Sequence, residues 1–359
     1  MTEQFQVKMP HHAAGCHPEK KKFDYLLWGS LVSVVALYLL NWQFANQIRF
    51  NLMLATLSHS TFELINTIWW GILVGMMMVA ILTKVPREFV TSLLGTGTGI
   101  SSILRATLGG VLLDLCSHGI LMVGAKLYER GVSTGQVMAF LVASPWNSFS
   151  LTLILIALIG MPWTIFFIAA SMLIAVLTGL IFEKLTTANV LSENPNKIDL
   201  PEEFQFWHEV KFRFSNTKFS VSFFRSMILD GIVESRMVIR WILFGVLLAS
   251  LVRTFVDASS FQAYFGPTLV GLGLTLVAAT IIEVCSEGST PIAADILTRA
   301  HAPGNSFAFL MTGVATDYTE IMVLRDTTKS WKIALFLPLI TVPQVVLIAW
   351  LINILSVSG

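Results

Sequence analysis

Charged side chains are scarce in this chain, and their scarcity excludes most classes of soluble protein. Of its 359 residues, 13% are charged and 55% are hydrophobic, and the mean hydropathy is +0.73. Soluble domains carry about 25% charged residues, so a soluble fold of this composition would lack the polar surface that covers a core. The composition therefore predicts an all-α polytopic membrane protein.

The sequence also lacks the features of several other functional classes. Three cysteines (Cys16, Cys116 and Cys285) are too few for a disulfide scaffold of this length. A net charge of +1 without a long basic stripe gives no support to nucleic-acid binding. No Walker-type Gly-x-x-x-x-Gly-Lys-Ser/Thr segment is present, so the chain itself does not hydrolyse ATP. No nucleophile, base and orienting residue combine into a catalytic set, and we expect neither an enzyme nor a cofactor.

Apolar stretches of about 20 residues mark the predicted membrane spans. Seven are clear, at 24–42, 63–83, 134–160, 163–183, 237–255, 303–324 and 333–355. Two longer ones, 98–130 and 267–299, are interrupted by small polar residues. The chain opens with a polar segment that ends in three lysines and shows no cleavable signal peptide. We therefore expect a bacterial inner (plasma) membrane protein with a cytoplasmic N-terminus.

The distribution of basic residues favours two re-entrant hairpins. If all nine stretches cross, the 23 Lys and Arg divide almost equally between the two sides. If 98–130 and 267–299 instead enter the membrane and return to the same side, all Lys and Arg except Arg49, Arg253 and Arg299 lie on the cytoplasmic side, as the positive-inside rule requires.

The chain divides into five predicted segments. A polar insertion separates its two membrane regions, and apolar groups at near-helical spacing over 219–236 predict an amphipathic helix on the inner membrane surface. The alternative is a solvated linker with scattered aromatics. The segments are a cytoplasmic tail (1–23), a first span with its linker (24–62), membrane repeat 1 (63–183), a cytoplasmic linker (184–236) and membrane repeat 2 (237–359).

The two membrane regions match each other without a gap when the chain is aligned with itself. Cys116-Ser117-His118-Gly119 aligns with Cys285-Ser286-Glu287-Gly288, and Ala-Phe-Leu recurs in register further along. Such duplication is typical of transporters. It predicts two homologous halves, arranged as inverted repeats with broken or re-entrant helices and with a binding site near the bilayer midplane.

Four interruptions carry most of the polar chemistry inside the apolar stretches. They are 116–119, 144–148, 285–291 and 312–317, and they form two repeat-related pairs. Hydroxyl and amide groups there would face a substrate, although small polar residues also let membrane helices pack closely. The candidate substrate-binding residues are Cys116, Ser117, His118, Asn147, Cys285, Ser286 and Thr316.

Two kinds of chemistry are expected at these interruptions. Cys116, His118 and Cys285 are tentative ligands for a soft metal or metalloid; alternatively, the two cysteines are inert packing residues. Carboxylates inside a bilayer usually mark an ion or proton route, although these could pair structurally with Arg105, Lys126 or Arg299. The proton-coupling candidates are Asp114, Glu283, Glu287, Asp317 and Glu320.

The duplicated Cys-Ser-x-Gly element, followed by Gly131, Gly135, Ala139-Phe140-Leu141 and Pro145-x-Asn147, resembles the predicted-permease family of ArsP-type organoarsenical efflux permeases and YraQ-type proteins. The resemblance covers about residues 60–355. It implies an inner-membrane permease, some members of which export trivalent organoarsenicals. His118 stands where many relatives have a second cysteine, so the substrate does not transfer with the family. Relatives are also usually drawn with about eight spans, which differs from the seven crossings and two hairpins predicted above.

The leading hypothesis is a proton-coupled exporter of a thiophilic metal, metalloid or organoarsenical. Its partners would be the lipid bilayer, a small inorganic or organometalloid substrate and protons. The alternative is a carrier or channel for a small anion or sulfur compound, which would use half-helix amino ends as the anion site. A membrane enzyme built around Cys116 is the weakest hypothesis, because no base accompanies the thiol.

Overall fold

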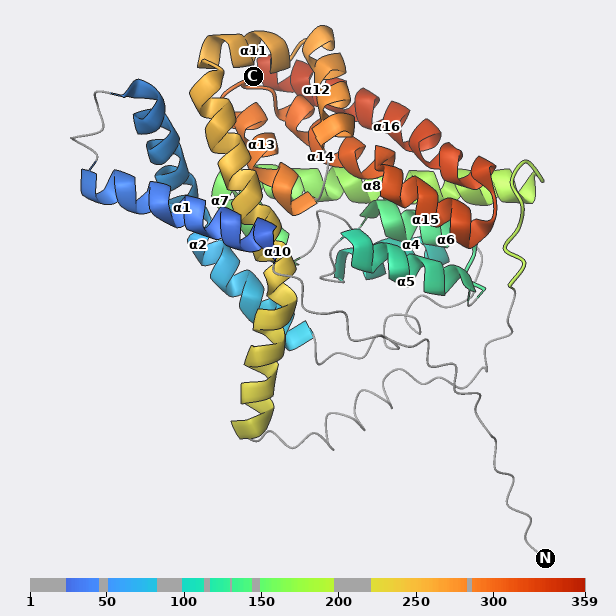
Figure 1. The fold of residues 1–359 in the computed structure, drawn as a ribbon. Helices are drawn as coiled ribbons and strands as arrows, with labels where there is room; N and C mark the ends of the chain where they lie inside the picture. Colours follow the sequence, from blue (N-terminus) through green and yellow to red (C-terminus); the bar gives the residue numbers. More distant parts are fainter. Residues whose placement is uncertain are drawn as a thin grey trace, which may run out of the picture.

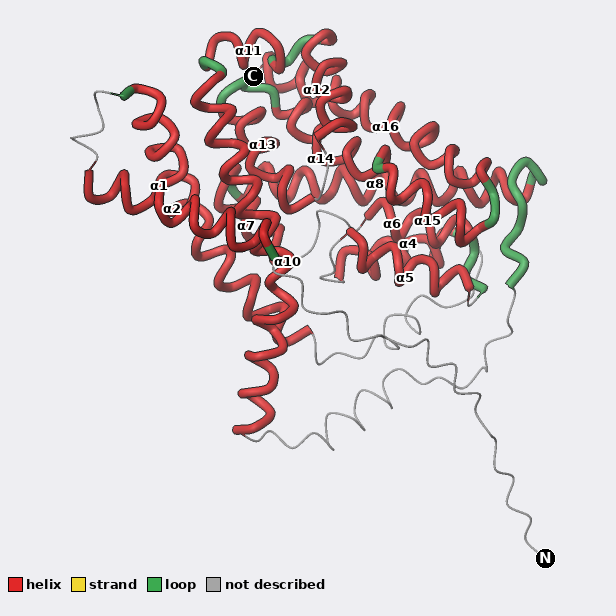
Figure 2. The backbone as a smooth tube through the Cα atoms, viewed as in Figure 1, coloured by secondary structure: helices red, strands yellow, loops and turns green. Residues whose placement is uncertain are grey.

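The structure is a computed structural model that describes residues 24–44, 51–82, 99–112, 117–129, 131–143, 149–196, 221–282 and 286–358. Within these ranges every regular element is an α-helix (Figures 1 and 2). The helices are α1 (Tyr25–Phe44), α2 (Leu52–Leu82), α4 (Ile100–Leu112), α5 (Ser117–Glu129), α6 (Thr134–Ala143), α7 (Phe149–Ile159), α8 (Met161–Thr187), α10 (Val221–Phe255), α11 (Ala258–Phe265), α12 (Leu269–Ile282), α13 (Ser286–Thr298), α14 (Pro303–Thr316), α15 (Tyr318–Thr328) and α16 (Trp331–Ser358).

Several of these helices are long and apolar enough to cross a membrane. Among the described residues the segments that meet this test are Tyr25–Phe44, Met161–Thr187, Pro303–Thr328 and Trp331–Ser356. A fifth is Ile239–Phe255 together with Ala258–Phe265, if this pair, bent by 108°, is one span. The expected class, an all-α polytopic membrane protein, is confirmed.

Large apolar side chains cover the outside of the molecule. A soluble protein would hide them, whereas hydrocarbon accepts them and leaves hydrogen-bonded helices as the stable form of the backbone. On α16, the exposed ones are Trp331, Leu335, Leu339, Leu347, Trp350, Leu351, Ile354 and Leu355. The surface pattern therefore fits a protein that lipid surrounds.

Helix bounds recur at the offset of the sequence repeat, which is the offset that takes Cys116 to Cys285. At this offset α5 coincides with α13 at both ends, and α7 coincides with α15 in the same way. The connection before each following long helix is short in both halves, but its conformation differs: Gly160 has φ 83° and ψ 159°, whereas Lys329 is left-handed with φ 54° and ψ 22°. The matching helix bounds support the predicted duplication. Whether the two halves are inverted stays a prediction.

Close helix packing in each half depends on a repeated glycine. Gly135 on α6 lies so near α8 that an added Cβ would be 2.6 Å from the carbonyl oxygen of Gly179. Gly304 on α14 meets the carbonyl oxygen of Ala349 on α16 in the same way. Small residues at these positions let the backbones of neighbouring helices approach each other.

Helix α10 is much longer than the span predicted within it. It has 35 residues, which corresponds to about 50 Å and exceeds a hydrocarbon core of about 30 Å. Its amino-terminal part projects beyond the other helices in Figure 1. Residues 221–236, predicted to lie on the membrane surface, are therefore continuous with the span that follows, and the predicted segment boundary at 236 falls inside this helix.

Candidate functional site

The predicted site residues lie where helices begin and end. Five of them are outside the described residues: Asp114, Cys116, Asn147, Glu283 and Cys285. Four others belong to the first turns of half-helices, namely Ser117 and His118 in α5 and Ser286 and Glu287 in α13; the structure describes their backbone but not their side chains. Thr316, Asp317 and Glu320 are described in full.

The predicted interruptions lie at helix ends, but most of their described residues are helical: 117–119 open α5, 286–291 open α13 and include Pro291, and 312–316 close α14. α4 ends before the first and α5 begins at Ser117, while α12 ends before its repeat and α13 begins at Ser286. The other pair separates α6 from α7 and α14 from α15. The first backbone N–H groups of a helix have no partner within that helix and carry partial positive charge. The partial positive charges at the amino ends of α5, α13 and α15 therefore lie at the predicted interruptions.

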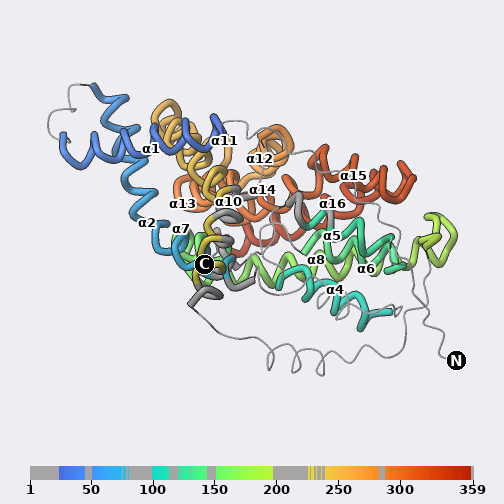
Figure 3. The backbone as a smooth tube through the Cα atoms, turned by 60° about the horizontal axis from the view of Figure 1, so that its bottom comes forward, coloured from blue at the N-terminus to red at the C-terminus, as the bar shows by residue number. Residues whose placement is uncertain are grey.

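The half-helices of one half pack against those of the other. α5 contacts α15, and α13 contacts α7, which are repeat-equivalent pairs. Figure 1 and Figure 3 both show α5 beside α15, although they lie far apart in the sequence. α8 and α16, also equivalent, contact each other, and Gln344 donates a hydrogen bond to Thr178 at 3.1 Å across them. The interrupted helices therefore lie where the two halves meet.

Threonine hydroxyls gather at the interruption between α14 and α15. Thr316 Oγ1 is 3.1 Å from Thr280 Oγ1 on α12, and it also lies 2.8 Å from the carbonyl oxygen of Thr312. Thr280 in turn contacts the carbonyl oxygen of Leu276 at 3.0 Å. The two hydroxyl groups carry one hydrogen each but make three oxygen–oxygen contacts. At any time one of these contacts has no hydrogen in it, so the pair can accept a hydrogen bond from a ligand.

Thr312 adds a third hydroxyl one turn earlier on α14. It is 1% exposed, and its Oγ1 has no hydrogen-bond partner among the described residues. A buried polar group without a partner costs about 1–3 kcal/mol, so its presence is more typical of a functional position than of plain packing. The sequence marked Thr312 only as the start of an interruption.

The two described carboxylates at this interruption have different surroundings. Asp317 separates α14 from α15, and its Oδ1 accepts the backbone N–H of Thr319 at 2.9 Å, so it caps α15. Glu320 lies in the first turn of α15 and is 2% exposed. The positive end of the helix stabilises both carboxylates. Glu320 is the more enclosed of the two.

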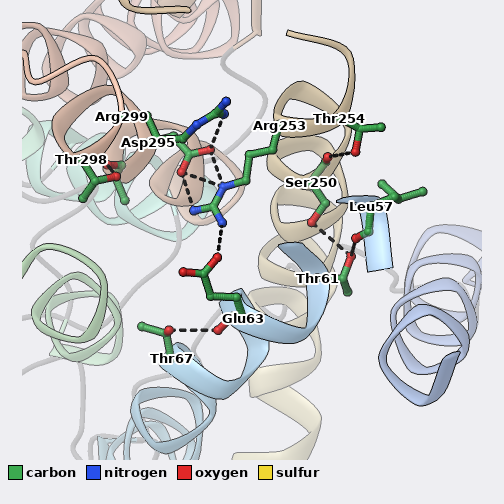
Figure 4. A network of polar contacts seen from close by, with 11 residues as sticks. Leu57, Thr61, Glu63, Thr67, Ser250, Arg253, Thr254, Asp295, Thr298 and Arg299 are labelled. Atoms are coloured by element: carbon green, nitrogen blue, oxygen red, sulfur yellow. Dashed lines mark hydrogen bonds and ion pairs between the residues drawn. The ribbon is translucent and has the colours of Figure 1, made fainter. Parts of the chain in front are cut away.

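A buried aspartate that sequence reasoning missed lies on α13. Asp295 is 1% exposed and accepts hydrogen bonds from Arg253 on α10 (Figure 4). Arg299, directly after the end of α13, approaches it at 3.6 Å. Arg253 and Arg299, which the charge count placed on the same side of the membrane, thus converge on one carboxylate. The available signal was the i, i+4 spacing of Asp295 and Arg299 in an apolar stretch.

The described basic residues have partners other than the predicted carboxylates. Lys126 pairs with Glu129 on α5 at 2.5 Å, and Arg299 pairs with Asp295. The guanidinium of Arg105 is 3.4 Å from the hydroxyl of Ser101. Asp114 and Glu283 lie outside the described residues, so structural pairing of these two carboxylates with Arg105, Lys126 or Arg299 stays an alternative to proton coupling.

Close backbone contact seats the start of α13 against α10. An added Cβ at Gly245 would collide with the carbonyl oxygen of Gly288, three residues after Cys285. This contact places the first turn of α13 directly beside α10. The described residues contain no group of three His, Cys, Asp or Glu side chains arranged to hold a metal ion. The proposed ligands Cys116, His118 and Cys285 are outside that search, so metal binding stays a prediction.

A groove away from these interruptions lies between the first turns of α8 and the last turns of α16. Its volume is about 460 Å³ and its walls are apolar. It is lined by Pro162, Trp163, Phe166, Ile352, Leu355 and Ser356. None of these is a predicted site residue, and the groove fits the lipid-facing surface.

Comparison with known proteins assigns the chain to a family. A family model described as a predicted permease matches residues 50–354, which include all four interruptions and both sets of half-helices. No curated protein and no solved structure is significantly similar to the chain.

Proposed function

This chain belongs to the ArsP-type predicted permease family, and from that membership we propose that it exports a thiophilic metal, metalloid or organoarsenical in exchange for protons. The family resemblance read from the repeated Cys-Ser-x-Gly element is thereby confirmed. Together with the membrane-spanning helices, the family makes the chain a multi-pass membrane transporter. The substrate, the direction and the coupling ion are our proposal.

One observation carries this proposal: a helix break is described at Asp317, in one of the four repeat-related interruptions, and the half-helices beside these interruptions pack across the two halves. Irregular backbone at membrane depth persists only where it lies within protein or lines water. Transporters use such discontinuous helices to build a substrate site that alternates between the two sides of the membrane.

The substrate would be held by soft and polar groups at these positions. Cys116, His118 and Cys285 supply a thiol, an imidazole and a second thiol, which suit a thiophilic or borderline species. Hydroxyl and amide groups would come from Ser117, Asn147, Ser286 and Thr316. The role of Thr316 is supported by the contact of its hydroxyl with that of Thr280.

Protons would be carried by the acidic residues beside the same interruptions. Glu283 and Glu287 lie four residues apart, near the amino end of α13, where two carboxylates favour sharing one proton. Asp114 is the equivalent acid of the first half. Glu320 is supported by its burial, whereas Asp317 also has a structural role as the cap of α15.

The second candidate is a carrier for a small anion or sulfur compound. It is favoured by the position of α5 and α13, whose amino ends lie directly at the interruptions. Unpaired N–H groups at a helix start bind anions without any need for a thiol.

Uptake into inverted membrane vesicles separates these candidates. Thiophilic metal ions, arsenite and trivalent methylarsenical would be supplied with and without a proton gradient. We expect one of them to accumulate only with the gradient, and accumulation to be lost in Cys116→Ser and Cys285→Ser. Cys16→Ser is the matched control, because it removes the third thiol outside the membrane repeats.

Two results would change the proposal. If both thiol variants match the wild type, the cysteines are packing residues and the anion carrier becomes the better candidate. If Glu287→Gln retains gradient-dependent uptake, Glu287 does not carry the coupling proton. Glu129→Gln provides a matched control for that variant, since Glu129 is half-exposed and pairs with Lys126.

A further inference from the structure

Arg253 binds two carboxylates that belong to different halves of the chain. Its Nε is 3.0 Å from both carboxylate oxygens of Asp295 on α13, and its Nη2 is 2.6 Å from Oδ1 (Figure 4). Its Nη1 donates to Glu63 Oε2 on α2 at 2.8 Å. Glu63 lies in the first membrane region and Arg253 in the second, and their helices, α2 and α10, pack against each other.

The two interactions of Arg253 differ in strength. The Asp295 side chain is 2% exposed and takes the guanidinium in a forked geometry, whereas the Glu63 side chain is 60% exposed and takes one hydrogen bond. Buried, forked charge pairs are strong and costly to break; exposed single pairs are weak and screened by salt. A movement between α2 and α10 would therefore break the contact with Glu63 first.

The surroundings anchor Arg253 to the second half. Arg299, directly after the end of α13, also approaches Asp295, and its own guanidinium donates a hydrogen bond to the carbonyl oxygen of Val256 at 3.2 Å and lies 5.0 Å from the centre of the Phe261 ring. Helices α14 and α7 also pack against α13. The Ser306 hydroxyl on α14 donates a neutral hydrogen bond to the carbonyl oxygen of Ala293, and α7 contains no charged residue. Asp295 therefore keeps both arginines when α2 moves.

One neutral hydrogen bond accompanies the charged contact to α2. Thr61 Oγ1 lies 3.1 Å from Ser250 Oγ, almost one turn before Arg253 on α10. Both residues are fully buried. Glu63 on α2 also reaches the Asp295 cluster, through its contact with Arg253 and with a side chain that is 60% exposed (Figure 4).

We propose that the Arg253–Glu63 ion pair is a releasable latch between the two halves of the transporter. It is closed in the conformation described above and opens when α2 separates from α10, while Arg253 stays on Asp295. The inference rests on the proposed function in one respect, namely that alternating access requires the halves to move relative to each other. Glu63 and Arg253 are positioning residues in this scheme and do not contact substrate.

A distance measurement tests the latch without any substrate. Nitroxides would be attached through non-natural amino acids at Met53 on α2 and Tyr264 on α11, both 59% exposed, which leaves the native thiols in place. Pulsed electron paramagnetic resonance on the protein in liposomes then gives the distance distribution. We expect Glu63→Gln to raise the fraction of a second, more separated population about three- to tenfold, the change expected from losing one charge-assisted hydrogen bond.

The controls separate a latch from general loss of charge. Asp326→Asn removes a carboxylate with 61% side-chain exposure that pairs with the adjacent Arg325, and it should leave the distribution unchanged. Glu63→Asp should restore part of the wild-type distribution. High salt should reproduce the effect of Glu63→Gln in the wild type, because an exposed ion pair is screened, and should add nothing to the variant.

The proposal is overturned if Glu63→Gln has the wild-type distribution, if Asp326→Asn shifts it equally, or if salt acts on both proteins alike. A positive result stands even when no compound in the vesicle assay accumulates. Failure of the export proposal and failure of the latch are therefore distinguishable.

Discussion

The two halves of this protein share their helix bounds but differ in what they bury. Position 126 on α5 corresponds to position 295 on α13, where an exposed lysine in the first half is replaced by a buried aspartate with two arginines. Position 136 on α6 corresponds to 305 on α14, where weak hydrogen bonds of Gln136 are replaced by short ones of Asn305. The apolar pattern and the helix stops therefore suffice for the shared architecture, while polar groups are free to specialise.

The largest difference between the halves should appear at positions 295 and 126. Asp295→Ala leaves Arg253 and Arg299 without their buried partner, so the free energy of unfolding should fall by about 3–5 kcal/mol. Lys126→Ala removes a pair whose side chains are 68% and 53% exposed and should cost about 0–1 kcal/mol. Denaturant unfolding of the purified protein in micelles measures both. Equal losses would show that the second half has no special dependence on its charge cluster.

Substitution of the repeat-equivalent glycines Gly135 and Gly304 should lower stability by similar amounts, because here the two halves pack in the same way. Gly304→Ala drives a methyl group into the Ala349 carbonyl, and Gly135→Ala drives one to 2.6 Å from that of Gly179. Each should lower stability by about 1–3 kcal/mol, because backbone cannot move aside as a side chain does. Gly273→Ala is the control: nothing lies within 4 Å of its added Cβ, so it should be neutral or gain about 0.5–1 kcal/mol of helix stability. Thermal unfolding compares the three, and a stable Gly304→Ala would contradict the close packing of α14 on α16.

A smaller contrast is expected between Asn305 and Gln136. The Asn305 amide donates to the carbonyl oxygens of Phe265 and Gly266 at 2.9 and 2.8 Å and accepts from Asn353 at 2.8 Å. Asn305→Ala should cost about 2 kcal/mol, since three buried groups lose a partner. The contact from the Gln136 amide to the carbonyl oxygen of Ser102 is 3.5 Å long, so Gln136→Ala should cost less than Asn305→Ala. If the order of the two losses in chemical unfolding is reversed, hydrogen-bond length is not the cause of the difference.

The smallest effect on stability should come from the cap of α15. Asp317→Ala removes the acceptor for the Thr319 N–H and should cost about 1 kcal/mol, whereas Asp317→Asn keeps an acceptor and should cost less. Vesicle uptake by the Asn variant then separates the two roles of this residue. A stable but inactive Asp317→Asn protein would support proton coupling, and a stable, active one would leave Asp317 with the cap alone.

Much of the fold could be predicted from the chain, and the limits have physical causes. Apolar length identified α1, α8 and α16, because this signal is local, whereas small polar residues with Gly and Pro marked the neighbourhood of helix ends and not the ends themselves, since Pro291 lies inside α13. The extension of α10 was missed, since apolar groups at helical spacing look the same in a surface helix and in the first half of a long span. Asp295 was missed because its partner Arg253 is distant in the chain, and only the packing of α10 on α13 joins them.

The sequence by itself determined that this is a helical membrane protein of duplicated design, because composition, span length and the match between its two membrane regions are properties of the chain alone. Only the tertiary structure decided which charges meet. A buried, ionised carboxylate is costly unless it is paired, and which of the 23 Lys and Arg residues lies beside Asp295 depends on which helices pack together. The tertiary structure also decided that Arg253 reaches across to Glu63, since α2 and α10 are neighbours in space and not in the chain.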